Sequence, residues 1–224
     1  MKRLTTTLIA SALMSLAASA SAVVLTPGVM TPLPGTTVAL DPDLAGIVVE
    51  DVTQAFSFAA NGGTISGTVQ SRVVRSTLDG TLDFYWRVES DRASAAAMQS
   101  FRVGNFFTDT YDADWRIDGA GDTAPLNGLH FNNALGNVNF EFSDLQGGGL
   151  GAGSSSFFVF LDTSATRYAR TAVYDLTNIG QTEISVLYDT FAPSYVPEPG
   201  SAALVGLGMA GLLFGRRRRT AKPG

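Results

Sequence analysis

The sequence predicts an all-β body, folded as an antiparallel β-sandwich for which a jelly roll is one candidate topology. Three observations predict this class. Apolar and polar residues alternate with a period of two over several segments, Gly-rich turn signals separate these segments, and only one short segment of the body favours a helix. Roughly nine or ten strands are expected between residues 46 and 195.

The clearest alternation runs through residues 82–89, where apolar positions should face a core and the intervening positions water or a partner. The two sets are Leu82, Phe84, Trp86 and Val88, and then Asp83, Tyr85, Arg87 and Glu89. The same period predicts three further core faces, formed by Ile65, Val69 and Val73, by Val138, Phe140 and Phe142, and by Ile184, Val186 and Tyr188. The segment from Phe157 to Leu161 is apolar at every position, which indicates a central strand.

Turn residues separate the predicted strands, and they supply the backbone conformations that tight turns need. The signals are Asn61-Gly62-Gly63, Asp79-Gly80, Asp118-Gly119, Asn127-Gly128 and Gly147-Gly148-Gly149. The Ala-rich segment from Arg92 to Gln99 is the one helix candidate in the body. Residues 23–45 contain four prolines, which favours a leading arm that is irregular or forms short edge strands.

Charge and composition exclude several function classes. Only 8 of the 15 basic residues, but 19 of the 20 acidic ones, lie between Val23 and Tyr195, so this body carries a net charge of about −11. Such a surface repels phosphate backbones, and nucleic acid is not an expected partner. The chain has no cysteine, which excludes disulfides, thiolate catalysis and cysteine-ligated metals. No cofactor is expected.

The first 22 residues have the composition of a signal peptide. Lys2 and Arg3 precede an apolar run that ends in small residues, and Ala20 and Ala22 suit the signal peptidase pocket. We expect cleavage after Ala22, with Ala20 as the alternative, and passage through the Sec translocon. An uncleaved anchor helix is the other interpretation of this segment.

The last thirty residues contain a proline-rich motif, an apolar segment and a basic cluster in that order. Pro197 and Pro199 prevent a helix from extending back through the motif, which should be extended and accessible. The apolar segment, residues 201–215, spans about 22 Å as a helix, so it would anchor weakly in a ~30 Å hydrocarbon core. The basic residues that follow should stay cytoplasmic, with residues 220–224 as a short cytoplasmic tail; they are Arg216, Arg217, Arg218 and Arg219.

This arrangement resembles the PEP-CTERM sorting signal over residues 196–219. The motif residues that carry the resemblance are Val196, Pro197, Glu198 and Pro199. The resemblance implies recognition by exosortase, an integral-membrane cysteine protease or transpeptidase, in a Gram-negative host that makes exopolysaccharide. It further implies that the tail holds the protein transiently in the inner membrane and is then cut. The body would be released or attached to the cell envelope, the surface or the extracellular matrix of a biofilm.

The body offers one candidate metal site. Five aspartates lie close together in sequence, and calcium binds carboxylate oxygens in many exported modules; they are Asp109, Asp112, Asp114, Asp118 and Asp122. Asp112, Asp114 and Asp118 are the most plausible ligands, although their spacing departs from that of an EF-hand. Solvated turn residues are the favoured interpretation, so no metal is predicted.

The remaining candidates are weaker. His130 is the only histidine, and we expect a structural or exposed role for it rather than a catalytic one. A carbohydrate-binding module would require a row of exposed aromatic side chains on one sheet, for which the candidates are Tyr85, Tyr168, Tyr174, Trp115 and Phe158. A secreted hydrolase would require a cleft with two close carboxylates, one of raised pKa. A non-enzymatic envelope or matrix protein is the first hypothesis, and these two are the alternatives.

Overall fold

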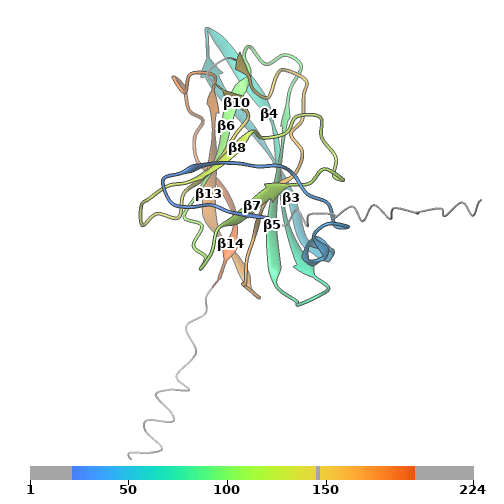
Figure 1. Ribbon diagram of the computed structural model, residues 1–224. Helices are drawn as coiled ribbons and strands as arrows, with labels where there is room; N and C mark the ends of the chain where they lie inside the picture. Colours follow the sequence, from blue (N-terminus) through green and yellow to red (C-terminus); the bar gives the residue numbers. More distant parts are fainter. Residues whose placement is uncertain (1–21, 145–146, 195–224) are drawn as a thin grey trace, which may run out of the picture.

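The computed structural model describes residues 22–144 and 147–194, which form two six-stranded antiparallel sheets packed face to face (Figure 1). The predicted all-β class is therefore confirmed. The predicted signal helix, the sorting motif and the helix at residues 201–215 lie outside the described residues. The only helical element in the described part is a short 3-10 turn, η1 (Pro42–Leu44).

The first sheet has the strand order β1-β7-β12-β5-β4-β3. Its strands are β1 (Val23–Val24), β7 (Asp112–Trp115), β12 (Val159–Asp162), β5 (Leu82–Ser90), β4 (Gly63–Ser76) and β3 (Gly46–Ala60). The apolar strand β12 lies between β7 and β5, which confirms the predicted central strand. Three consecutive strands, β3, β4 and β5, pair as a meander within this sheet.

The second sheet has the strand order β14-β13-β6-β9-β8-β2. Its strands are β14 (Tyr188–Pro193), β13 (Tyr168–Asn178), β6 (Met98–Gly104), β9 (Val138–Glu141), β8 (Asn127–His130) and β2 (Met30–Pro32). A separate two-stranded ribbon joins β10 (Ser143–Asp144) to β11 (Gly147–Gly148).

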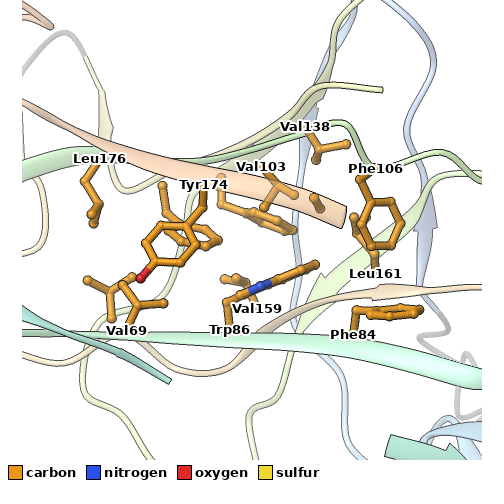
Figure 2. Close-up of a cluster of buried hydrophobic side chains, with 14 of the residues drawn as sticks. Val69, Phe84, Trp86, Val103, Phe106, Val138, Val159, Leu161, Tyr174 and Leu176 are labelled. Atoms are coloured by element: carbon orange, nitrogen blue, oxygen red, sulfur yellow. The ribbon is translucent and has the colours of Figure 1, made fainter. Parts of the chain in front are cut away.

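The core lies between the two sheets, where alternate side chains of each sheet interdigitate. Figure 2 shows Trp86 and Phe84 of β5 pointing toward Tyr174 and Val103 of the second sheet. The predicted core positions of β4, β5 and β9 are all buried, and eight of them have no exposed surface. These eight are Ile65, Val69, Val73, Leu82, Phe84, Val88, Val138 and Phe140.

The predicted leading arm joins the two sheets. Its β1 pairs with β7 at one edge of the first sheet, and its β2 pairs with β8 at one edge of the second. The arm, drawn in blue, crosses the sandwich and returns through η1 to β3 (Figure 1). Its prolines lie at sheet edges or in turns, where a missing N–H leaves no ladder bond broken.

Two of the predicted turns lie at the ends of hairpins. Asn61 and Gly62, both with positive φ, connect β3 to β4, and Gly80 lies between β4 and β5. The prediction at Asn127-Gly128 was wrong because these residues belong to β8, where the Leu25 side chain packs against Gly128. Gly147 and Gly148 likewise form β11 rather than a turn.

Three further expectations are corrected. The segment from Arg92 to Gln99 forms turns and then enters β6, so the predicted helix does not form. Ile184 and Val186 are exposed, because Ser185 instead faces inward and exchanges hydrogen bonds with the backbone of Leu176. On β5, Asp83 and Tyr85 are buried although they face away from the main core.

Candidate functional site

The outer face of the first sheet carries side chains that change from acidic to aromatic to basic along the strands. Because Phe84 and Trp86 point into the core, Asp83, Tyr85 and Arg87 point to the opposite face. On β12 and directly before it, the corresponding residues are Asp162, Phe160 and Phe158. Across the sheet, Tyr85 is level with Phe160 on one side and with Arg72 on the other.

The acidic end consists of three aspartates on adjacent strands, which we call the acidic row: Asp112 on β7, Asp162 on β12 and Asp83 on β5. Asp162 pairs in register with Asp112, and its carboxyl also lies against that of Asp83. Burial and the Asp162 charge raise the pKa of Asp83, and burial also raises the pKa of Asp162. The two carboxyls therefore share a proton, with Asp83 donating to Asp162.

Asp43, which lies in η1, and Asp41, which directly precedes η1, add negative charge near the acidic row. The Asp41 charge contributes to the raised pKa values of Asp83, Asp162 and also Asp114. Asp114 is fully buried, and burial raises its pKa to about 6 even though its Oδ1 accepts hydrogen bonds from the backbone N–H groups of Gly35 and Trp115.

The middle of this face is a small aromatic cluster beneath η1. It contains Tyr85, Phe158 and Phe160, with Leu44 of η1 and Val74 of β4 packed against them. The Tyr85 ring lies 5.3 Å from that of Phe160 and 6.3 Å, edge on, from that of Phe158. The cluster explains why Tyr85 is buried on an outer face: η1 covers it, and sequence alternation alone does not report such a cover.

The basic end is a pocket of about 300 Å³ lined by three arginines over the aromatic cluster, which we call the arginine pocket. Each guanidinium is held by an acidic neighbour at 2.7 Å: Arg72 by Asp51, Arg87 by Glu89 and Arg116 by Asp118. The Arg72 guanidinium carbon lies 4.8 Å from the centre of the Phe158 ring. The pocket thus combines planar guanidinium groups with the aromatic rings of Tyr85 and Phe158.

Two polar groups of the arginine pocket are buried without a hydrogen-bond partner among the described residues. They are the Tyr85 hydroxyl and the Arg87 Nε. Both can donate a hydrogen bond, and buried polar groups in native proteins nearly always have partners. The Arg116 guanidinium nevertheless lies beside the Tyr85 hydroxyl and offsets part of the rise that burial causes in its pKa.

A second hollow lies on the outer face of the second sheet, with a volume of about 460 Å³. Its lining includes the asparagines 105, 133, 137 and 139 and the ion pair of Arg102 with Asp175, in which Nη2 and Oδ2 are 2.7 Å apart. Sequence analysis did not single out this hollow, because its asparagines come from loops and strands that only the fold brings together.

The five aspartates of the calcium candidate do not converge. Asp112 and Asp114 lie on β7 rather than in turns, so the solvated-turn interpretation was wrong for them. Asp118 pairs with Arg116 and accepts a hydrogen bond from the Val38 N–H, which lowers its pKa. Asp109 and Asp122 are exposed. Within residues 22–144 and 147–194, no three His, Asp or Glu side chains form a group that could hold a metal ion.

His130 has the structural role that was expected. It is buried and stacks on Tyr111 with ring centres 3.7 Å apart, and burial lowers its pKa. The five aromatic candidates form no exposed row. Tyr85 and Phe158 meet in the arginine pocket, Tyr174 lies in the main core, and Trp115 and Tyr168 are half-buried elsewhere.

The hydrolase alternative predicted two close carboxylates with one raised pKa, and Asp83 and Asp162 match that part of the description. Asp83 is only 1% exposed, however, so a substrate cannot reach its carboxyl. The pair therefore lacks the cleft that such chemistry requires.

Comparison with known families bears on the C-terminal segment. Residues 196–219 match the family model described as the PEP-CTERM protein-sorting motif. The chain carries a PEP-CTERM sorting motif. This motif marks a protein for export, transient anchoring in the membrane and processing by exosortase, as the sequence predicted.

No curated protein and no solved structure matches the chain, so these comparisons assign no family to the β-sandwich body. The sorting residues Val196, Pro197, Glu198 and Pro199, and the basic cluster Arg216 to Arg219, lie outside the described residues. In the part of the chain that the structure covers, no helix has the length and apolarity needed to span a membrane.

Proposed function

We propose that this protein is a non-enzymatic component of the cell envelope or extracellular matrix, delivered there by its two terminal segments. The match of residues 196–219 to the PEP-CTERM motif carries the proposal. The β-sandwich supports it, because the Asp83 carboxyl of its candidate pair is buried while its arginine pocket is open to a ligand.

Each terminal segment has a physical role in this proposal. The signal peptide directs the chain to the Sec translocon, and signal peptidase cuts at Ala22 or Ala20. The apolar segment at residues 201–215 then halts transfer, with Arg216 to Arg219 on the cytoplasmic side of the inner membrane. The rigid segment around Pro197 and Pro199 presents the cleavage region to exosortase outside the membrane.

The sorting step is tested by the intact mass of the protein from host cells with and without exosortase. We expect the protein from exosortase-containing cells to lose residues after the Pro-Glu-Pro motif, and the protein from deficient cells to retain Gly224. Replacement of Pro197, Glu198 and Pro199 by alanine should trap the uncut form. A product that still ends at Gly224 in cells with active exosortase would remove the sorting proposal.

A second proposal concerns the ligand of the body, which we infer to be an acidic saccharide held in the arginine pocket. The pocket is lined by Arg72, Arg87 and Arg116, whose guanidinium groups suit a carboxylate. The ring of Phe158 beneath Arg72 offers an apolar surface, which suits the face of a sugar ring. The exopolysaccharide implied by the sorting system is one source of such a ligand.

Titration calorimetry with an oligomer of a uronic acid, and with a neutral glucan of equal length, tests this ligand class. We expect the acidic oligomer alone to bind, and Arg87→Ala to weaken that binding at least tenfold. The matched control is Arg92→Ala, because Arg92 is an exposed arginine outside the pocket. Equal binding of both oligomers, or no effect of Arg87→Ala, would refute the proposal.

A further inference from the structure

The acidic row and the adjacent Asp41 form a concentration of negative charge that no basic side chain neutralises. Among the described residues, the four ion pairs engage Asp51, Glu89, Asp118 and Asp175, and none of them includes a member of the row. Asp83 is 1% exposed, and its Oδ2 has no hydrogen-bond partner of its own. A buried carboxyl group in this state calls for a cation or a proton.

The start of the described chain lies at this same place. The backbone N–H of Ala22 donates a hydrogen bond of 3.2 Å to Oδ2 of Asp41. The next two residues pair with β7, Val23 with Ala113 and Val24 with Asp112, which belongs to the acidic row. Ala22 also packs against the aromatic cluster on the outer face of the first sheet. The backbone around the predicted cleavage site is therefore fixed beside the negative charge.

Amine chemistry makes this position unusual within the body. The chain has no lysine between Val23 and Tyr195, and its only two lysines are Lys2 and Lys222. Signal peptide removal therefore creates the one primary ammonium group of the body. Cleavage after Ala22 creates it on Val23, which pairs with Ala113 and lies next to Val24, the partner of Asp112.

We propose that the α-ammonium group released by signal peptidase binds Asp41 and the acidic row, so that processing itself supplies the missing counter-charge and stabilises the sandwich. Cleavage after Ala20 keeps the bond from Ala22 to Asp41 and places the charge on Ser21, the residue directly before Ala22. Cleavage after Ala22 removes this bond together with Ala22 and places the charge on the neighbouring Val23, at the start of β1. This proposal rests on the export part of the proposed function and is independent of exosortase and of the saccharide ligand.

The test compares two chemical modifications of the processed protein purified from the host. Acetic anhydride converts the α-amine to a neutral amide, whereas reductive methylation alters the same amine but keeps its positive charge. We expect acetylation to lower the thermal unfolding midpoint by several degrees and methylation to leave it within about one degree. The acetylation effect should disappear in Asp41→Asn and persist in Asp109→Asn, which changes an exposed aspartate away from the row.

Mass spectrometry of the N-terminal peptide separates the possible failures. A protein that retains Met1 would overturn both the export proposal and this one. A correctly cleaved protein whose unfolding midpoint is equally affected by acetylation and methylation would overturn the ion pair alone. If Asp41→Asn does not fold, the comparison of acetylated with methylated wild-type protein still decides, because it needs no substitution.

Discussion

Trp86 and Thr190 connect the two sheets through a hydrogen bond in the middle of the core. The Trp86 Nε1 donates to Oγ1 of Thr190 over 2.7 Å, and the threonine hydroxyl donates in turn to Oγ of Ser71. Trp86 and Thr190 are each 1% exposed. A large aromatic residue is thus fixed in one orientation, because its single polar atom has one acceptor within reach.

Replacement of Thr190 by valine should destabilise the protein by about 1–3 kcal/mol, because the indole N–H would remain buried without an acceptor. Valine matches threonine in shape, so little of this loss would come from packing. Urea unfolding followed by tryptophan fluorescence measures it. Thr171→Val, on the exposed part of β13, is the control and should change stability by less than about 0.5 kcal/mol.

Asp83→Asn should remove a pH dependence from the stability of the fold. Burial and neighbouring acids raise the pKa of Asp83 from 3.8 to about 9, the neighbours being Asp162, Asp79 and Asp41. The folded state therefore binds the proton more tightly than the unfolded state. Its stability is greatest below the ordinary pKa and falls as the pH rises from about 4 toward about 9.

The asparagine variant stays neutral across this range and can still donate to Asp162. At pH 8 we expect it to be more stable than the wild type by roughly 2 kcal/mol, and at pH 4 the two should be nearly equal. Chemical denaturation at both pH values measures the difference, with Asp109→Asn as an exposed control. A variant that loses stability at pH 8 would contradict the assignment of a neutral Asp83.

Phe106 and Phe107 are neighbours in sequence with opposite surroundings. Phe106 has no exposed surface and meets the Phe84 ring edge on at 5.1 Å, whereas Phe107 is 49% exposed. Phe106→Ala should cost about 3–5 kcal/mol because it leaves a cavity in the core. Phe107→Ala should cost less than about 1 kcal/mol. Thermal unfolding of the two variants provides a matched comparison of identical chemical changes.

Gly67 on β4 leaves room for the ring of Phe56, its cross-strand partner on β3. A Cβ at this position would lie 2.9 Å from the Phe56 ring and 1.9 Å from the Glu89 carbonyl oxygen. Gly67→Ala should therefore destabilise the fold by about 1–3 kcal/mol, since strand β5 would have to shift. Thr64→Ala, at an exposed position of the same strand, is the control. Equal denaturation midpoints for both variants would show that the strands adapt without cost.

Local alternation predicted the fold class and most core positions because strands β4, β5 and β9 each have one face in a continuous core. It was wrong where another segment covers the opposite face. Asp83 and Tyr85 alternate with core residues as exposed positions do, yet both are buried, and Leu44 of η1 packs in one cluster with Tyr85. The prediction that Ile184 and Val186 face the core was also wrong. Ser185, which lies between them, faces inward instead and accepts a hydrogen bond from the backbone N–H of Leu176.

The outer face of the first sheet was only partly predictable. Sequence analysis named Tyr85, Phe158, Asp112, Asp114 and Asp118 separately, for ligands of different kinds. Their arrangement depends on the strand order β7-β12-β5-β4, in which β12 becomes the neighbour of two strands that lie about 50 and about 75 residues before it in the chain. The arginines of the pocket were missed as a group for the same reason, although Arg87 had been placed correctly on an outward face.

The irregularity in β3 has a consequence for how the protein behaves when many copies are crowded together. Strand β3 is an outer edge of its sheet, and Ile47 and Val48 are 66% and 47% exposed there. Pairing with β4 shifts between Val48 and Glu50, so that Val49 is a bulge. A flat strand from another molecule could not follow this edge past the bulge. The kink thus protects an apolar border from fibre-like self-association, and the charged residue Glu50 follows it directly.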